Sequence, residues 1–174
     1  MCIFCSKKFP LEYQLIKEFD DWYFVADINP MRDFHCLLVS KNHYSWFEEI
    51  NNINTLKNFW NILKICILAI KNSNKNIINI SILSLNLWEK SKHLHFHLIP
   101  IFCNDSIKSI NDISIDWGWI HFLWNHEIIQ DSYKIYIENI FWTLSDDILK
   151  DIENKLKEKI IQNVKILKNN INYE

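Results

Sequence analysis

The 174-residue chain is nearly devoid of glycine and arginine, with Gly118 and Arg32 as the single residue of each type, and it has only three prolines. Loops that cradle phosphate with backbone amides, of the Walker or G-x-G-x-x-G kind, need several glycines and are excluded. Arginine clusters for phosphate or nucleic acid are excluded as well. Nineteen basic and 21 acidic residues give a net charge of -2. We therefore expect no nucleic-acid partner.

Long apolar segments are also missing. The longest, around Ile62 to Ile70, is interrupted by Lys64, and the amino terminus has neither a basic flank nor an apolar stretch. The sequence therefore predicts no transmembrane helix, no membrane partner and no signal peptide.

The five cysteines are an odd number in a chain without a secretion signal. This favours reduced thiols in the cytoplasm over a disulfide framework. Cys36 and Cys66 lie among Leu and Ile and are interpreted as small buried hydrophobic residues. Cys2 and Cys5 are three residues apart, a spacing at which two thiols can bind one metal ion, although such a pair alone is weak evidence.

Hydrophobic periodicity predicts three short strands, a helix and two more strands. The predicted ranges are Tyr13–Phe19, Trp22–Ile28 and Phe34–Ser40 for the first strands, Tyr44–Lys71 for the helix, and Ile77–Leu87 and His93–Phe102 for the last strands. This order favours an α+β fold with a mainly antiparallel sheet and a long helix after the third strand.

The last third of the chain is interpreted as an extension of one domain. Residues 1–174 are expected to form a single domain, with a core of residues 1–103 and an extension of residues 104–174. Within the extension, Ser106–Trp142 is rich in aromatic residues and has no clear period, whereas Thr143–Ile171 predicts a long amphipathic helix.

Three histidines, His93, His95 and His97, alternate with apolar residues in the last predicted strand. Alternate side chains of a strand share a face, so the three imidazoles are expected on one side of the sheet. Such a row suits a tri-histidine metal site or nucleophilic catalysis by one histidine. Neighbours on one face of a straight strand lie roughly 6.5 to 7 Å apart, so the outer two diverge from one zinc ion. Geometry therefore favours a single reacting histidine.

The row resembles the signature His-φ-His-φ-His-φ-φ of the histidine triad (HIT) family of nucleotide-binding hydrolases and transferases, met here by His93–Ile99. The stretches Ala26–Pro30 and Phe34–His43 are similar to the upstream block of that family, "D-I-x-P…G-H-x-L-V-x-P-K-x-H". The start Cys2-Ile3-Phe4-Cys5 is similar to the C-I-F-C start of its zinc-containing bacterial branch. The resemblance covers residues 1–103 and implies a HIT-like fold.

The resemblance implies that His95 is the nucleophile that attacks the α-phosphorus of a nucleotide derivative. A covalent nucleotidyl-histidine then passes to water, as neutral imidazole chemistry near pH 7 allows. The family commonly fixes the tautomer of this residue with a backbone carbonyl. By the same resemblance His97 donates to a phosphate oxygen, and His35 lines the same pocket.

Candidate substrate contacts also follow from the resemblance. Asp27 is expected to accept the ribose hydroxyls, although an Asp that starts a turn before Asn29-Pro30 explains it equally well. Ile28 is placed against the base, but an ordinary core position is favoured. The Gly-rich turn and Gln-Ser pair that usually precede the triad are replaced by a short segment without glycine, in which Asn86 and Ser91 are the candidate polar contacts.

The resemblance further implies a structural zinc site formed by Cys2, Cys5, His43 and His93. Sites closed by four protein ligands that include thiolates are structural rather than catalytic. The competing interpretation is two incidental cysteines and a surface histidine. No organic cofactor is expected.

The function implied is a nucleotide phosphohydrolase. It would release a nucleoside monophosphate from a dinucleoside polyphosphate, a nucleoside phosphoramidate or a related adenylated compound. A nucleotidyltransferase or phosphorylase, and a nucleotide-binding regulatory protein with vestigial activity, are the alternatives. The resemblance also implies a homodimer.

Overall fold

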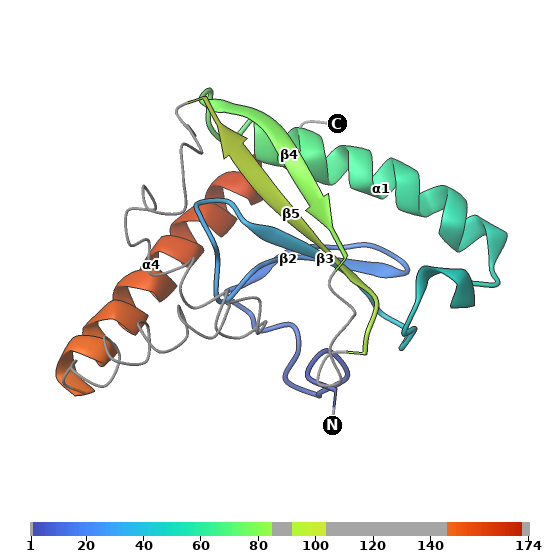
Figure 1. The fold of residues 1–174 in the computed structure, drawn as a ribbon, viewed down its shortest axis with the longest axis horizontal. Coiled ribbons are helices and arrows are strands. Elements are labelled where there is room, and N and C mark those ends of the chain that lie inside the picture. Colours follow the sequence, from blue (N-terminus) through green and yellow to red (C-terminus); the bar gives the residue numbers. More distant parts are fainter. Residues whose placement is uncertain (1, 85–91, 104–145, 172–174) are drawn as a thin grey trace, which may run out of the picture.

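A five-stranded antiparallel sheet forms the centre of the molecule in the computed structural model, which describes residues 2–84, 92–103 and 146–171 (Figure 1). The strands are β1 (Leu15–Glu18), β2 (Trp22–Ala26), β3 (Cys36–Ser40), β4 (Ile77–Leu83) and β5 (His95–Phe102). Their spatial order is β1-β2-β3-β5-β4, and every neighbouring pair is antiparallel. The expected α+β class with an antiparallel sheet is confirmed.

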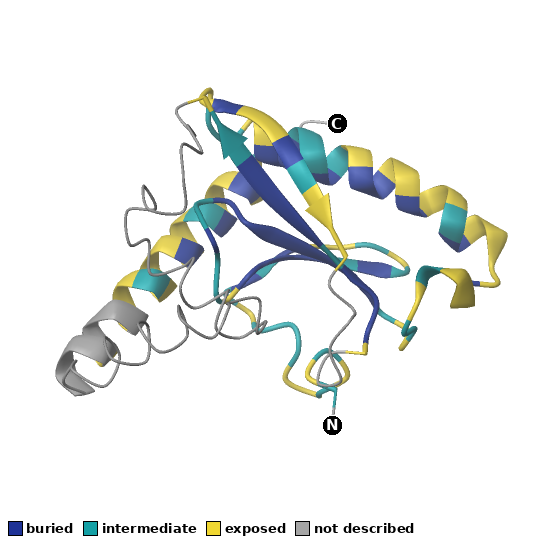
Figure 2. Ribbon diagram, viewed as in Figure 1, coloured by how far each residue is buried: buried dark blue, intermediate teal, exposed yellow. Residues whose placement is uncertain are grey.

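The two faces of the sheet are covered by different parts of the chain. One face carries the main core, where side chains such as Trp22, Phe24 and Leu98 pack with the helices α1 (Ile53–Lys71) and α4 (Asp146–Ile171). Figure 2 shows the buried stripe that each helix turns toward the sheet. On the other face, Val39 is paired with His95 and Leu37 with His97. The histidines of β5 therefore lie on the face opposite the helices.

Helix α1 begins later than its hydrophobic period predicts. The predicted helix starts at Tyr44, but α1 starts at Ile53, after a short 3₁₀ helix at Phe47–Glu49. The side chain of Asn52 accepts a hydrogen bond from the backbone N–H of Asn54 at 2.9 Å and caps the helix. The earlier residues keep the apolar period because Phe47 packs on the same core.

The first strands are shorter than predicted for local reasons. Phe34 has a φ of 61°, in the left-handed region that an extended strand excludes, so β3 starts at Cys36. The second strand ends at Ala26, before the turn at Asp27. The end of the predicted strand Ile77–Leu87 falls partly outside the described residues, and β4 is seen as far as Leu83.

The carboxyl-terminal helix joins the main core. Ile160, Val164, Leu167 and Ile171 of α4 are buried in the cluster that also holds the sheet and α1. The charged residues between Lys150 and Lys159 that the structure describes are exposed, as expected for the solvated side of an amphipathic helix. The amphipathic helix is confirmed from Asp146 onward, whereas its predicted first residues and the aromatic segment Ser106–Trp142 lie outside the described residues.

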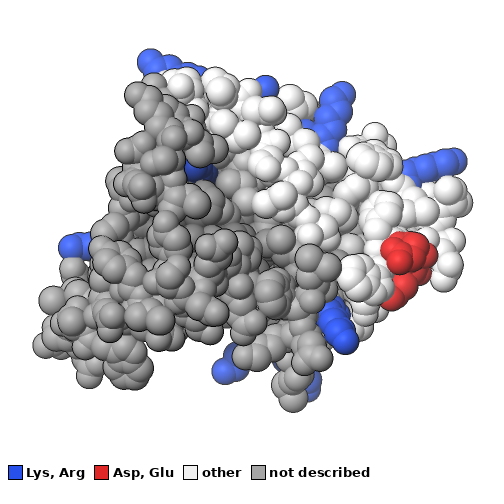
Figure 3. Space-filling model, in the orientation of Figure 1, with Lys and Arg blue, Asp and Glu red and all other residues white. Residues whose placement is uncertain are grey.

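On the face drawn in Figure 3, the described lysine and arginine side chains stand apart from one another, and one small group of acidic side chains lies at the right of the view. None of the helices in the described ranges is long and apolar enough to cross a membrane.

Candidate active site and metal centre

His95 is the first residue of β5, and its ring is held by the backbone just before it. Its Nδ1 lies 2.6 Å from the carbonyl oxygen of His93. A carbonyl oxygen only accepts hydrogen bonds, so Nδ1 of His95 carries the hydrogen and Nε2 of the neutral ring carries the lone pair. The ring is almost completely buried. His95 is thus held in the tautomer that a nucleophilic imidazole needs.

A second pair of histidines lies beside it. His35 precedes β3, and its Nε2 is 3.0 Å from Nδ1 of His97 on β5. The backbone N–H of Met31 donates to Nδ1 of His35 at 3.0 Å, so the hydrogen of the neutral His35 ring sits on Nε2 and is donated to His97. His97 accepts at Nδ1, and its own hydrogen is therefore on Nε2. A chain of two hydrogen bonds sets His97 as a donor.

Asp27 closes this group at the end of β2. Its Oδ1 accepts a hydrogen bond from the backbone N–H of Asn29 at 2.9 Å, so the turn interpretation of Asp27 holds. Its Oδ2 lies 3.5 Å from Nε2 of His35 and 3.6 Å from Nδ1 of His97. The carboxylate is nearly buried and faces both histidines.

The donor atoms of Asp27, His35 and His97 all lie within 4.8 Å of one another, a spacing that also suits a metal ion. The hydrogen bond from Met31 argues against one, because it occupies the lone pair of His35 Nδ1. The Nε2 that faces the cluster then bears hydrogen and cannot ligate a metal as a neutral imidazole. We therefore interpret this group as a hydrogen-bonded network.

Two expectations about substrate contacts have different outcomes. The core position favoured for Ile28 is wrong: its side chain is 42% exposed, because the turn made by Asp27 takes the chain out of the sheet. Ile28 is left as an exposed apolar residue next to Asp27. Asn86 and Ser91 lie outside the described residues.

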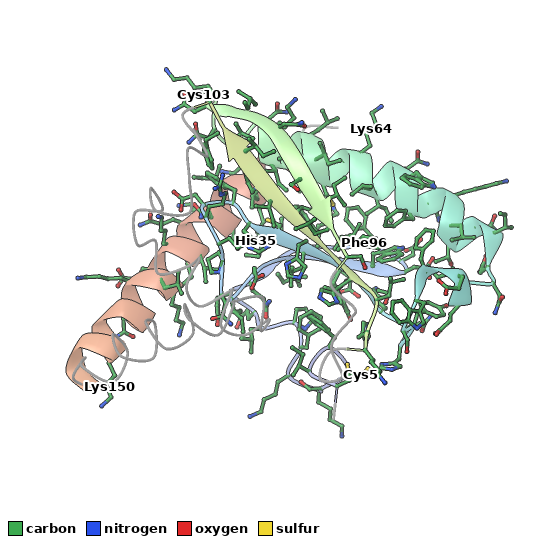
Figure 4. All side chains as sticks on the ribbon, viewed as in Figure 1. Cys5, His35, Lys64, Phe96, Cys103 and Lys150 are labelled. Atoms are coloured by element: carbon green, nitrogen blue, oxygen red, sulfur yellow. The ribbon has the colours of Figure 1, made fainter. Side chains whose placement is uncertain are left out.

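Four side chains of the types that bind metals come together beside the amino-terminal turn. The structure brings together Cys2, Cys5, His43 and His93, whose donor atoms lie within 4.8 Å of one another. Figure 4 shows Cys5 beside the segment that leads into β5. All four are the residues predicted for the zinc site.

The distances in this cluster fit one tetrahedral ion. Nδ1 of His93 is 3.5 Å from Sγ of Cys2, 3.4 Å from Sγ of Cys5 and 3.3 Å from Nδ1 of His43. Nδ1 of His43 is 3.2 Å from Sγ of Cys5. Ligands of a tetrahedral zinc ion are separated by about 3.5 Å for sulfur and nitrogen and about 3.3 Å for two nitrogens, given the usual bond lengths.

The protonation of His93 also suits a ligand. Its Nε2 lies 2.7 Å from the carbonyl oxygen of Ser40 and must donate to it, which leaves the lone pair on Nδ1, toward the cysteines. Burial lowers the pKa of His93 and so favours the neutral form that binds metal. Burial and the neighbouring Cys2 raise the pKa of the Cys5 thiol. A metal ion would offset that cost by binding the thiolate.

The sequence did not point to three residues that orient the site. The carbonyl of Ser40 and the N–H of Met31 act through the backbone, which has no residue-type signature. Phe4 places its ring against both His93 and His95, with centroid distances of 5.4 and 4.9 Å. Its position between the two cysteines was a usable signal, because a residue inside a metal-binding turn has to lie near the ligands.

The other cysteines are separate from both groups. Cys36 and Cys66 are buried in the main core as predicted, and burial raises the pKa of each thiol. Cys103 is exposed at the end of β5, and all five cysteines are free thiols.

Comparisons with known proteins identify the family. The HIT domain profile matches residues 10–103. An uncharacterized HIT-like protein of Methanocaldococcus jannaschii is 33% identical over 110 residues, which cover 60% of this chain and 82% of that protein. A HIT-like protein of Borreliella burgdorferi, also uncharacterized, is 36% identical over 113 residues, which cover 60% of this chain and 78% of that protein.

Solved structures share the fold. A zinc-bound histidine triad family protein from Mycobacterium smegmatis superimposes with a TM-score of 0.50 at 19% identity, covering 60% of this chain and 78% of that one. A hypothetical protein from Leishmania major also superimposes with a TM-score of 0.50, at 25% identity, covering 60% of this chain and 75% of that one. The sequence matches and the histidine strand agree, and the chain belongs to the HIT domain family.

Proposed function

We propose that the chain is a nucleotide phosphohydrolase that acts through a covalent nucleotidyl-His95 intermediate. The substrates proposed are dinucleoside polyphosphates, nucleoside phosphoramidates or related adenylated compounds, and the product is a nucleoside monophosphate such as AMP. The observation that carries the proposal is the 2.6 Å hydrogen bond from His95 Nδ1 to the His93 carbonyl. It leaves the lone pair of Nε2 for attack on phosphorus.

The reaction has two displacements at one phosphorus atom. In the first, the Nε2 lone pair of His95 forms a bond to the α-phosphorus, and the bond from phosphorus to the leaving oxygen or nitrogen breaks. The leaving group takes that electron pair and a proton from solvent. In the second, water attacks the same phosphorus and loses a proton, and Nε2 of His95 departs with the electron pair of the P–N bond.

The neighbouring histidines stabilise negative charge in this scheme. His97, held as an Nε2–H donor by His35, donates to a phosphate oxygen. Donors that are oriented before the substrate binds lower the barrier most, because they need no rearrangement during the reaction. The only arginine, Arg32, instead donates to the carbonyl of Pro100 at 3.0 Å. Neutral donors therefore carry much of this task.

The substrate is proposed to lie over Asp27 and Ile28. The carboxylate of Asp27 accepts the ribose hydroxyls, and the exposed side chain of Ile28 contacts the base. Asn86 and Ser91 remain predicted substrate contacts from the sequence. Asp27 is nearly buried beside His35 and His97, which supports a ribose site close to the reacting atoms.

A structural zinc ion is proposed at Cys2, Cys5, His43 and His93. When bound, it crosslinks the amino-terminal turn to the segment that enters β5. The donor set and the distances above support this proposal. The homodimer and the cytoplasmic location stay predictions.

The test is release of AMP from a panel of adenylated substrates by the wild-type chain and by His95→Gln. We expect the substitution to reduce kcat by about 1,000-fold or more, because no other group replaces the nucleophile. Quenching with alkali and denaturant during turnover preserves the acid-labile P–N bond, so it should trap a nucleotide on the wild-type protein and none on His95→Gln. Equal release by both proteins would reject the mechanism.

Two further results would favour the alternatives. Nucleotide transfer to phosphate or to an alcohol in preference to water would favour a transferase or phosphorylase. Nucleotide binding by the wild type without any release of AMP would favour a regulatory binding protein.

A further inference from the structure

We propose that the hydroxyl of Ser40 is a positioning group for the two histidine ligands of the zinc site, His43 and His93. This role rests on the zinc site proposed above and concerns a residue that does not itself bind the metal. Ser40 is the last residue of β3 and is almost completely buried. Its hydroxyl and its carbonyl contact the segments that carry these two histidines.

The hydroxyl of Ser40 lies between two backbone carbonyls from distant parts of the chain. Its Oγ is 2.9 Å from the carbonyl oxygen of Asn42 and 3.0 Å from that of Leu94. A hydroxyl has one hydrogen to donate, so the two carbonyls share it. Asn42 immediately precedes His43, and Leu94 immediately follows His93. The hydroxyl therefore holds together the two short segments from which the histidine ligands project.

Backbone groups strengthen the same connection. The N–H of Leu94 donates to the carbonyl oxygen of Tyr44 at 2.6 Å, and the N–H of Ser40 donates to the carbonyl oxygen of Leu94 at 3.1 Å. The carbonyl of Ser40 accepts the Nε2 hydrogen of His93 at 2.7 Å. Among these contacts the hydroxyl is the group that depends on residue type, so its contribution can be tested by substitution.

The exposed ligand is the one that needs such support. His93 is fully buried, whereas His43 is exposed, so burial does not fix the position of the His43 ring. Its Nδ1 nevertheless lies 3.3 Å from that of His93, as binding to one ion requires. A backbone that is held beside His43 before the metal binds reduces the ordering that the metal has to impose. Without this support, zinc binding would be weaker even with all four ligands present.

Serine at this position also departs from the family pattern. When Phe34–His43 is aligned with the upstream block G-H-x-L-V-x-P-K-x-H, Ser40 takes the place of the proline. Proline has neither an N–H nor a hydroxyl, so of the contacts above it could offer only its carbonyl. The bridge between Asn42 and Leu94 therefore does not follow from the family block.

The expected effect is that of one hydrogen bond. In Ser40→Ala each carbonyl keeps a backbone donor, because the N–H of Tyr44 reaches Asn42 and the N–H of residue 40 reaches Leu94. Zinc binding should therefore weaken by about fivefold to 10-fold, less than when the direct outer partner of a ligand is lost. Ser40→Thr keeps the hydroxyl and should bind zinc within about threefold of the wild type.

Ser73→Ala is the matched control. The hydroxyl of Ser73 also donates to a backbone carbonyl, that of Ala69, at 2.7 Å, and it accepts from the side chain of Asn170 at 3.0 Å. Both of these partners lie outside the zinc site. Ser73→Ala should therefore lower the unfolding midpoint as Ser40→Ala does, without changing the affinity for zinc.

The experiment measures zinc affinity by competition with a chelator for the full-length wild type, the three serine variants and Cys2→Ser. The unfolding midpoint is recorded for each protein. Amide hydrogen exchange at Leu94, whose N–H is bonded to the carbonyl of Tyr44, reports how firmly the two segments are joined. We expect this exchange to be faster by about fivefold to 10-fold in Ser40→Ala and unchanged in Ser73→Ala.

The outcomes separate the role of Ser40 from the zinc site itself. If Cys2→Ser binds zinc as tightly as the wild type, the zinc site is rejected, and the role of Ser40 with it. If Cys2→Ser loses zinc but Ser40→Ala and Ser73→Ala bind it equally well, only the role of Ser40 is rejected. Equal exchange at Leu94 in those two variants would also reject it, because the hydroxyl would not hold the segments together. The same holds if a folded Ser40→Thr binds zinc as weakly as Ser40→Ala.

Discussion

His93 acts on His95 through its backbone while its own side chain faces the cysteines. The carbonyl oxygen of His93 accepts the Nδ1 hydrogen of His95 at 2.6 Å, and Nδ1 of His93 lies 3.4 Å from Sγ of Cys5. The sequence pattern places the two imidazoles side by side on one strand face. In the structure the His93 ring faces the cysteines, whereas the His95 ring donates to the carbonyl of His93. His93 thus connects the four candidate zinc ligands with the tautomer of the proposed nucleophile.

Replacing His35 should impair His97 without removing a substrate contact. In His35→Leu, Nδ1 of His97 loses its donor, so the neutral ring populates both tautomers and donates less often to phosphate. We expect kcat to fall by about 10-fold to 100-fold. Steady-state kinetics with a good and a poor leaving group measure the loss at each displacement.

His35→Gln is the matched comparison. Its amide offers a donor for His97 and an acceptor for the N–H of Met31, so it should retain more activity than His35→Leu. Equal losses in the two variants, with equal folding, would show that packing rather than the hydrogen bond is what His35 supplies.

Asp27→Asn separates the turn role from binding of ribose. Asparagine keeps the oxygen that accepts the N–H of Asn29, so the turn should survive. Loss of the charged acceptor should raise KM for a ribonucleotide substrate by about 10-fold, since hydrogen bonds to charged groups contribute about 1.5 to 3 kcal/mol.

The control is the corresponding substrate without ribose hydroxyls. Its KM should be the same for Asp27→Asn and the wild type. An equal change in kcat for both substrates would mean that Asp27 acts on His35 and His97, which its Oδ2 faces, and not on the ribose.

Much of the fold could be predicted because hydrophobic period reports burial. Period-two alternation from His93 to Leu98 indicated a strand with the histidines on one face, and β5 places His95 and His97 on that face. The period did not indicate where α1 starts, because Phe47 packs on the same core as the helix. Helix α1 begins after the cap at Asn52, and a pattern of apolar residues carries no information about such a cap.

The side chains of the two clusters could be named from the sequence, but their orientation could not. Hydrogen bonds to the carbonyls of His93 and Ser40 and from the N–H of Met31 decide which nitrogens carry hydrogen. Backbone groups are the same for every residue type, so no motif reveals them. The core position predicted for Ile28 is wrong because an apolar residue after a strand suggests burial, whereas the turn at Asp27 exposes it.

Helix α4 should be essential to stability. Leu167 is fully buried in the main core, so Leu167→Ala should reduce the free energy of unfolding by about 2 to 5 kcal/mol. Leu167 also lines a small cavity with Phe34 and His35, so Leu167→Ala also removes packing beside His35 of the candidate active site. Ile166 is the control, because its side chain is 40% exposed and Ile166→Ala should change stability by less than about 0.5 kcal/mol. Urea unfolding of both variants measures the difference, and similar losses would mean that α4 does not pack as described.

Zinc binding should release protons and weaken as the pH falls. The pKa of the Cys5 thiol is raised by burial and by Cys2, so near pH 7 the metal-free protein holds this thiol protonated. Zinc binds the thiolate, and each proton released makes the apparent affinity fall by about 10-fold for each pH unit below the thiol pKa. Competition with a chelator between about pH 8 and about pH 6 measures the slope.

Cys2→Ser should weaken zinc binding by more than about 100-fold, because loss of a ligand exceeds the effect of losing an outer partner. Cys103→Ser is the control, since that thiol is exposed and outside the cluster. An affinity that does not change with pH, or that falls equally in both variants, would place the metal elsewhere.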